Sequence, residues 1–302
     1  MRANAIVAGV NKAGTTSLFV SLSTHPEVAA ATVKETRYFL PARWGRSLEP
    51  VDVYEAAFDD APDTARVRIE ATPSYFYGAQ AVIDAMRSVC GDDLRVIVVL
   101  REPVARFWSF FTFQKARLRI PDDLGAGEYL AHADALSDDD FREPENERWF
   151  AFRGGCYADW LPAWHSAFGA RLRVEFFENL MAEPDRVLHD AARFLGIDPD
   201  GFPSTSLASE NRTTGYKRAG FQRVALAFND RFERFLRRHY GLKERLRSIY
   251  YRLNGASRRE QMPVSVRAML TDRYAEPNAR LAEQLAAMGV TDAPSWCAAK
   301  VG

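Results

Sequence analysis

The chain has 302 residues, and its 40 basic and 40 acidic side chains give a formal net charge of zero at neutral pH. With 47% hydrophobic and 26% charged residues, the composition is typical of a globular enzyme domain and excludes a low-complexity chain. The three cysteines are widely separated and form no C-x-x-C pair, so we expect no zinc site, no disulfide framework and no other metal site.

The first apolar segment, residues 5–10, is too short for a membrane span or for the hydrophobic part of a signal sequence. A glycine turn follows it, which predicts that it is the first strand of a sheet. We therefore expect a cytoplasmic protein with neither a membrane nor a nucleic-acid partner. The preference for arginine over lysine indicates a bacterial gene.

Short apolar runs alternate with amphipathic stretches, which predicts an α/β fold with helices on both faces of a parallel sheet. The strands are predicted near residues 5–10, 66–70, 95–100 and 171–176, and the helices near 15–24, 79–89, 103–118, 157–168 and 184–195. Further helices are predicted near 220–239, 242–253 and 263–287. We expect a single domain, with an α/β core of about residues 1–200 and a helical part of about 205–290 packed on it.

The turn after the first predicted strand has the layout of a phosphate-binding loop. Gly9 and Gly14 bracket four residues, as in the loop of nucleotide triphosphatases, but Thr15 takes the place of the usual lysine, and Lys12 lies inside the turn. Amides at the start of the following helix have no partner within the helix, and the helix dipole adds positive charge. This pattern favours a phosphate-like anion. An ordinary turn capped by Thr15 or Thr16 is the alternative.

A second motif follows the strand at residues 95–100. Arg101 stands where a magnesium-binding nucleotide triphosphatase would usually carry an aspartate, and Pro103 suits the first turn of a helix. An arginine at this place predicts a second anion rather than a metal. Ser109 lies eight residues further along the same predicted helix.

The two motifs together resemble the cofactor motifs of sulfotransferases, which use 3'-phosphoadenosine 5'-phosphosulfate (PAPS). Four more segments are similar to the branch that contains heparan sulfate sulfotransferases and many bacterial relatives, namely residues 34–39, 70–76, 155–164 and 177–196. The resemblance implies a P-loop-like three-layer sandwich. It also implies transfer of a sulfuryl group from PAPS to a hydroxyl or amine of a small-molecule or carbohydrate acceptor, with no metal and with release of 3',5'-adenosine bisphosphate (PAP).

The resemblance assigns the cofactor contacts as follows. The first loop would hold the 5'-phosphosulfate, and Arg101 and Ser109 would hold the 3'-phosphate. Lys12 would stabilise the leaving oxygen. The predicted loop contacts are Lys12, Ala13, Gly14, Thr15, Thr16 and Ser17. Lys217 and Arg218 are placed like a late basic loop of the family over the same phosphate; their order departs from the family pattern, and a plain basic loop is the alternative.

The resemblance also assigns a general base. Glu35 matches the glutamate of the family's Lys-Glu-x-x-x-Phe segment, so we expect it to take the acceptor proton. The ordinary pKa of a glutamate, about 4.3, makes it a weak base for an aliphatic hydroxyl. A surface glutamate in a charged turn is the alternative. Arg37, Glu70 and Tyr75 are further candidates for contact with the acceptor, and Glu70 is the rival base.

Two segments are strongly biased in charge. Residues 121–147 carry ten acidic side chains against one arginine, and residues 231–259 carry ten basic side chains against two glutamates. Solvated loops or helix faces are the ordinary interpretation of both. A lid over the acceptor for the first segment, and a polyanion site for the second, are the alternatives.

Two other classes of protein remain open at the level of sequence. A P-loop kinase would bind ATP with magnesium and would need a carboxylate near the loop, which Glu70 could supply. A non-catalytic nucleotide-binding protein would bind the cofactor without turnover. Only a sulfotransferase accounts for the loop, for Arg101 with Ser109 and for Glu35 together.

Overall fold

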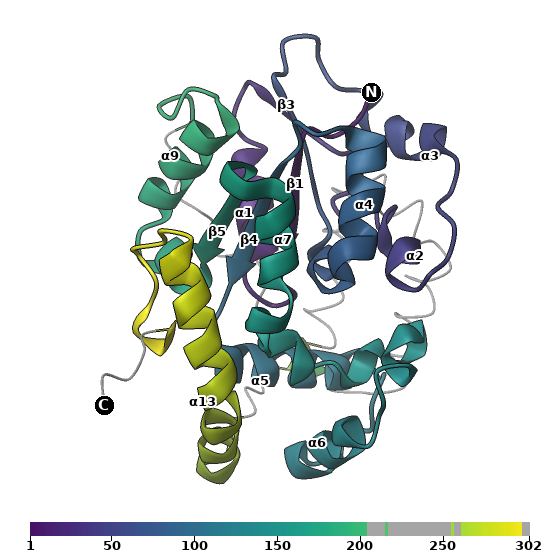
Figure 1. The fold of residues 1–302 in the computed structure, drawn as a ribbon, viewed down its shortest axis with the longest axis vertical. Helices are drawn as coiled ribbons and strands as arrows, with labels where there is room; N and C mark the ends of the chain where they lie inside the picture. The colour runs from purple at the N-terminus through teal and green to yellow at the C-terminus, as the bar shows by residue number, and fades with distance from the viewer. Residues whose placement is uncertain (204–214, 217–254, 257–260, 298–302) are drawn as a thin grey trace.

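The computed structural model describes residues 1–203, 215–216, 255–256 and 261–297 (Figure 1). The predicted helices 220–239 and 242–253 lie outside the described residues, and so do Lys217, Arg218 and most of the basic segment 231–259.

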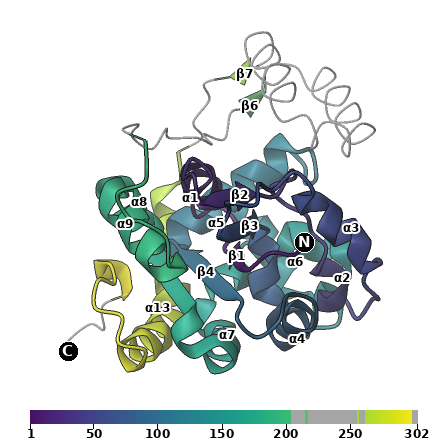
Figure 2. The same cartoon turned by 90° about the horizontal axis from the view of Figure 1, so that it is seen from above.

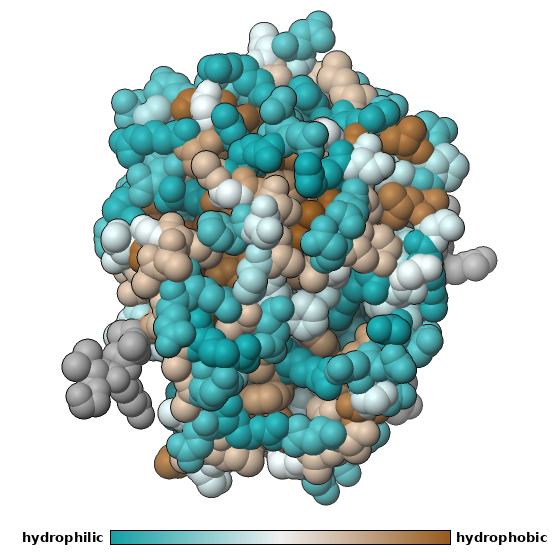
Figure 3. Space-filling model, viewed as in Figure 1, coloured by the Kyte–Doolittle hydropathy of each residue, from teal (hydrophilic) through white to brown (hydrophobic). Residues whose placement is uncertain are grey.

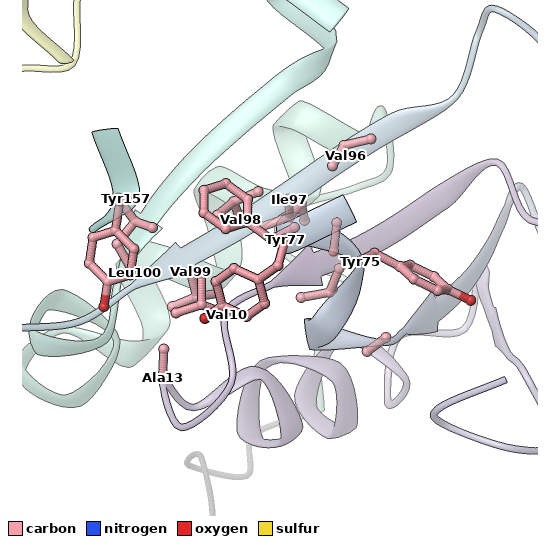
Figure 4. Close-up of a cluster of buried hydrophobic side chains, with 14 of the residues drawn as sticks. Val10, Ala13, Tyr75, Tyr77, Val96, Ile97, Val98, Val99, Leu100 and Tyr157 are labelled. Atoms are coloured by element: carbon pink, nitrogen blue, oxygen red, sulfur yellow. The ribbon is translucent and has the colours of Figure 1, made fainter. Parts of the chain in front are cut away.

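Five parallel strands form one sheet in the order β2-β3-β1-β4-β5. They are β1 (Ala5–Gly9), β2 (Val28–Ala30), β3 (Val67–Ala71), β4 (Arg95–Leu100) and β5 (Leu172–Phe176). The central strands are apolar along their length because both faces of the sheet are covered. In β4 every residue after Arg95 is 0% exposed, and Figure 4 shows these side chains in one buried cluster with Tyr75, Tyr77 and Tyr157.

Helices cover both faces of the sheet, with α1 on one side and α4 and α7 on the other (Figure 2). The larger helices are α1 (Thr15–Leu22), α4 (Ala79–Cys90), α5 (Pro103–Ala116), α6 (Ala126–Asp134), α7 (Leu161–Phe168), α9 (Pro184–Leu195) and α13 (Val264–Ala287). Shorter elements are α2 (Leu40–Arg43), α3 (Val51–Glu55), α8 (Phe177–Ala182) and a two-stranded pair, β6 (Gly215–Tyr216) and β7 (Gly255–Ala256). The predicted α/β class and parallel sheet are confirmed.

Two local predictions were wrong. The strand β2 was missed because its three residues are too few to show a periodic pattern. The helix predicted for 157–168 begins only at Leu161, and a separate 3₁₀ turn, Tyr157–Asp159, precedes it. Pro162 at the second position of α7 explains the start, because proline is tolerated in a first helical turn but not deeper in a helix.

The C-terminal helix α13 packs against the segment that joins α6 to α7. The Tyr274 hydroxyl donates to the carbonyl of Phe152 at 2.9 Å, and Arg280 Nη2 lies 2.8 Å from Asp159. In Figure 1, α13 lies beside α5, the helix that starts at the carboxyl end of β4. The face seen in Figure 3 is mostly hydrophilic, with hydrophobic side chains in small areas between polar ones.

The end of β1 passes very close to a buried aromatic ring. A Cβ added at Gly9 would lie 2.7 Å from Cβ of Phe76 and 3.3 Å from a methyl group of Val98. Both neighbours are 0% exposed and have no room to move. The strand can reach the turn that follows it only because residue 9 has no side chain.

We therefore expect Gly9→Ala to lower the free energy of unfolding by about 1–3 kcal/mol, as an overpacked core does. Gly127→Ala in α6 is the matched control, because no atom lies within 4 Å of the added carbon. This control is expected to be neutral or slightly stabilising. Urea unfolding of both variants measures the difference, and equal stability of the two would contradict this account.

Candidate active site at the turn after β1

The turn from β1 to α1 lies at the carboxyl end of the sheet and is built on two left-handed residues. Lys12 has φ 72° and Gly14 has φ 80°. A lysine in this conformation costs about 1 kcal/mol, which other contacts must offset. Gly14 is also confined, because an added Cβ would lie 2.8 Å from the Phe177 ring.

Gly14 is the N-cap of α1, and because it has no side chain it supplies no capping hydrogen bond. Neither Thr15 nor Thr16 caps the helix, so the alternative of a threonine-capped turn was wrong. The first turn of α1 also contains no acidic residue. Thr15 and Ser17 are buried and Thr16 is half-buried. The positive end of the helix dipole therefore faces the turn without a carboxylate from its own first turn.

Two arginines from the segment after β4 hold the backbone of this turn. Arg101 Nη1 donates to the carbonyl of Lys12 at 2.8 Å, and Arg106 Nε donates to the carbonyl of Asn11 at 3.1 Å. The Arg101 guanidinium also lies 4.3 Å from the centre of the Phe177 ring. Burial lowers the pKa of Arg101 from its usual value, yet an arginine stays protonated at any physiological pH. The structure thus brings Arg101 to the predicted loop.

Sequence reasoning missed Arg106, which is 0% exposed. The available signal was its place in the first turn of the predicted helix, five residues after Arg101. The pattern gave no sign of its burial, because arginine is almost never fully buried unless it is paired.

The start of α5 is fixed by its own capping residue. Both carboxylate oxygens of Glu102 accept backbone amides, from Val104 at 3.1 Å and from Ala105 at 2.6 Å. The amide of Glu102 in turn donates to Oε1 of Glu178 in α8 at 2.9 Å. Glu102 was not singled out from the sequence, although an acidic residue directly before Pro103 is a helix N-terminus signal. These bonds hold Arg101 in place.

The other predicted cofactor residues lie on the same helix or beside it. Lys12 Nζ is 4.3 Å from the centre of the Phe113 ring of α5, which places the charged end of this lysine over the helix. Ser109 is half-buried in α5, one turn before Phe113. Of the predicted pair, Arg101 lies two residues before the start of α5, and Ser109 lies in the middle of this helix.

Glu35 lies between two cations. Its carboxylate is 3.4 Å from Lys34 Nζ and 3.5 Å from Arg37 Nη2, and its side chain is 36% exposed. Arg37 is itself exposed, and it adopts a left-handed conformation with φ 58°. The segment therefore presents a partly exposed carboxylate held by basic neighbours.

Glu70 has the opposite environment, because it is 0% exposed at the end of β3. Its carboxylate accepts four hydroxyl groups, from Thr36 at 2.8 Å, Thr72 at 2.9 Å, Tyr75 at 3.1 Å and Tyr54 at 3.2 Å. Burial raises the pKa of Glu70 to about 7, against these hydrogen bonds, which lower it. Glu70 and Tyr75 are thus bonded to protein groups within the core, which differs from the acceptor contact expected of them.

Within the described part of the chain, no three His, Cys, Asp or Glu side chains are grouped so that they could hold a metal ion. Over the same residues, no helix is both long enough and apolar enough to span a lipid bilayer.

A central parallel sheet covered by helices on both faces, with a basic turn between its first strand and α1, defines an α/β protein of the three-layer class. The sequence identifies the family, because residues 2–219 match the family model of the sulfotransferase domain. The chain belongs to the sulfotransferase family, a family of transferase enzymes.

Relatives and a solved structure agree with this assignment. Heparan sulfate glucosamine 3-O-sulfotransferase 3B1 of Mus musculus is 30% identical over an alignment of 203 residues that covers 64% of this chain and 46% of the mouse protein. The bifunctional heparan sulfate N-deacetylase/N-sulfotransferase of Drosophila melanogaster is 26% identical over an alignment of 212 residues that covers 64% of this chain and 20% of that protein. The chain thus spans less than half the length of these relatives.

A crystal structure of a sulfotransferase from Alicyclobacillus acidocaldarius has a TM-score of 0.69 to this chain, with 22% identity. The similarity covers 98% of this chain and 99% of that one. It confirms the fold.

The buried position of Glu70 predicts a pH dependence of stability. Because its pKa rises from 4.5 to about 7 on folding, the folded state binds the proton more tightly than the unfolded chain does. The contribution of protonated Glu70 to the free energy of unfolding is fully present below pH 4.5 and is lost as the pH rises through about 7. We expect the difference in unfolding free energy between wild type and Glu70→Gln to change by about 3 kcal/mol over this range. Urea unfolding across the range measures it, and a constant difference would refute the assignment.

Proposed function

We propose that this chain transfers a sulfuryl group from PAPS to a hydroxyl or amine of a carbohydrate or small-molecule acceptor. The observation that carries the proposal is the convergence of Arg101 and Arg106 on the turn that begins α1 and contains Lys12. A helix N-terminus without an acidic first turn, held by two arginines, fits a polyanionic nucleotide. The family and its relatives support the same reaction.

The chain's own residues divide the binding of the nucleotide between two sites. We assign the 5' side to the turn, where the amides of Gly14 and Thr15 and the hydroxyls of Thr16 and Ser17 would donate. Ala13 belongs to the same turn, but its amide donates to the carbonyl of Val10 at 3.3 Å. PAPS supplies the sulfuryl group, and Lys12 would stabilise negative charge on the leaving oxygen. Arg101 and Ser109 are assigned to the 3'-phosphate. Lys217 and Arg218 lie outside the described residues, and their contact with this phosphate stays a prediction.

Glu35 is assigned as the residue that takes the acceptor proton. Its carboxylate is partly exposed, so an acceptor can reach it, whereas the rival Glu70 is enclosed by four hydroxyl donors. Lys34 and Arg37, at 3.4 and 3.5 Å from the Glu35 carboxylate, would fix the position of this carboxylate. Arg37 is exposed beside this carboxylate and would contact the acceptor.

The same geometry argues against the kinase alternative. A kinase needs a carboxylate that can reach the phosphates and their metal, and Glu70 was the residue that could supply it. Its oxygens are instead bonded to Thr36, Thr72 and two tyrosines. A single-domain organisation, a cytoplasmic location, a bacterial origin and a lid formed by residues 121–147 stay predictions.

Calorimetric titration with PAP tests the cofactor site. We expect metal-independent binding of PAP by the wild type, and about tenfold to hundredfold weaker binding by Arg101→Ala, because a charge-assisted hydrogen bond is lost. Arg280→Ala is the matched control, since Arg280 is an exposed, ion-paired arginine on α13. Binding of ATP with magnesium in place of PAP would reject the sulfotransferase assignment in favour of a kinase.

Turnover tests the general base. With PAPS and a panel of heparan sulfate, shorter saccharides and phenols, we expect Glu35→Gln to lower kcat by about 10²- to 10⁴-fold and to leave the Kd for PAP unchanged. Glu55→Gln is the control, because Glu55 is 33% exposed and also bonds an arginine, Arg2, at 2.8 Å. Full activity of Glu35→Gln, or PAP binding without turnover on any acceptor, would remove Glu35 from this role.

A further inference from the structure

Arg106 is a buried charge whose hydrogen-bond partners are uncharged backbone carbonyls. The side chain is 0% exposed, and no ion pair of Arg106 occurs among the described residues. It donates from Nε to the carbonyl of Asn11 and from Nη1 to the carbonyl of Ala151, at 3.1 and 2.8 Å. Its third nitrogen, Nη2, is buried without a hydrogen-bond partner. Burying a guanidinium in this way is costly, and a purely structural role would be served better by an apolar side chain.

The guanidinium is held firmly on its other sides. The centres of the Tyr77 and Phe110 rings lie 5.9 and 5.5 Å away, and a Cβ added at Gly154 would lie 2.4 Å from Nη2. The Tyr77 hydroxyl donates to the carbonyl of Gly154 at 3.0 Å, so these two neighbours of the guanidinium are also bonded to each other. Arg106 is therefore a fixed connection between the turn after β1 and the segment around residues 151–154.

The bond to Asn11 determines how the turn presents its backbone. The peptide that joins Asn11 to Lys12 is trans and planar, so its N–H points away from the carbonyl that Arg106 holds. The next carbonyl, that of Lys12, is held by Arg101. Two consecutive peptides are thus oriented by two arginines, with Lys12 between them in its left-handed conformation.

We propose that Arg106 is a positioning residue for the nucleotide, which fixes the 5'-phosphate turn and adds positive charge to it without touching the ligand. This inference rests on the proposed PAPS-binding function. It predicts a selective effect: loss of Arg106 weakens ligands that carry a 5'-phosphate and leaves a ligand with only the 3'-phosphate unaffected.

The test combines two measurements on the full-length protein. Hydrogen exchange of the ligand-free protein, followed over residues 10–16, reports the order of the turn itself. Calorimetry with PAP and with adenosine 3'-monophosphate reports the consequence for binding. For Arg106→Met we expect faster exchange in the turn, about tenfold to hundredfold weaker PAP binding, and unchanged binding of adenosine 3'-monophosphate. Arg106→Lys, which keeps the charge but not the forked geometry, is expected to be intermediate.

Arg43→Met is the matched control. Its side chain is also buried, at 6% exposure, and its guanidinium lies 5.6 Å from the centre of the same Tyr77 ring, but it pairs with Glu147 at 3.2 Å rather than with the turn. We expect it to lose stability without a change in exchange at residues 10–16 or in PAP affinity. Equal effects of Arg43→Met and Arg106→Met would show that Arg106 is only structural.

A second pair of variants leaves Arg106 in the chain and serves if Arg106→Met does not fold. Gly154→Ala pushes against Nη2 of Arg106, whereas Gly155→Ala pushes against the Tyr274 hydroxyl, 2.6 Å from the added carbon. We expect only Gly154→Ala to weaken PAP binding and to speed exchange in the turn. Exchange that is unchanged in both Arg106→Lys and Gly154→Ala overturns the proposal. Failure of the wild type to bind PAP would overturn the proposed function, while exchange in the ligand-free protein would still decide the role of Arg106.

Discussion

The site depends on the hydrogen bonds that tie the turn after β1 to the segment after β4. A turn with left-handed residues at Lys12 and Gly14 does not hold its shape by itself, because the lysine is strained. The bonds from Arg101 and Arg106 to consecutive carbonyls offset that strain and leave basic groups at the positive end of α1. Charge and backbone geometry are thus supplied by the same two side chains.

That arrangement is only as rigid as the elements that carry the arginines. Glu102 caps α5 with both oxygens and is bonded through its amide to Glu178, so hydrogen bonds at this residue join the end of β4 to α5 and α8. The aromatic core continues the support, since the Trp164 indole donates to the carbonyl of Phe76 at 2.9 Å, below the end of β1. Figure 4 shows how closely the start of the turn lies against the end of β4. A site formed at strand ends therefore has a rigid base, which preorganised electrostatic binding requires.

Two glutamates near the site differ in solvent exposure and in the groups that bond their carboxylates. Glu35 is partly exposed between Lys34 and Arg37, and Glu70 is enclosed by hydroxyl groups in the core. The two are linked through Thr36, which follows Glu35 in the chain and donates to Glu70. The backbone adds to this link, since the amide of Ala71 donates to the carbonyl of Lys34 at 3.0 Å. The buried carboxylate therefore shapes the segment from which the exposed one reaches solvent.

Most of the strands and helices, the glycine turn after β1 and the arginine after β4 were predictable from sequence, because each leaves a local pattern of apolar periodicity, glycine spacing or helix start signals. The three-residue strand β2 and the start of α7 left no such pattern. Only the tertiary structure decided that Glu70 and Tyr75 belong to the core and that Arg106 reaches the turn. Burial and the pairing of distant groups depend on which elements pack together, and chain separations such as that between Asn11 and Arg106 leave no trace in a local pattern.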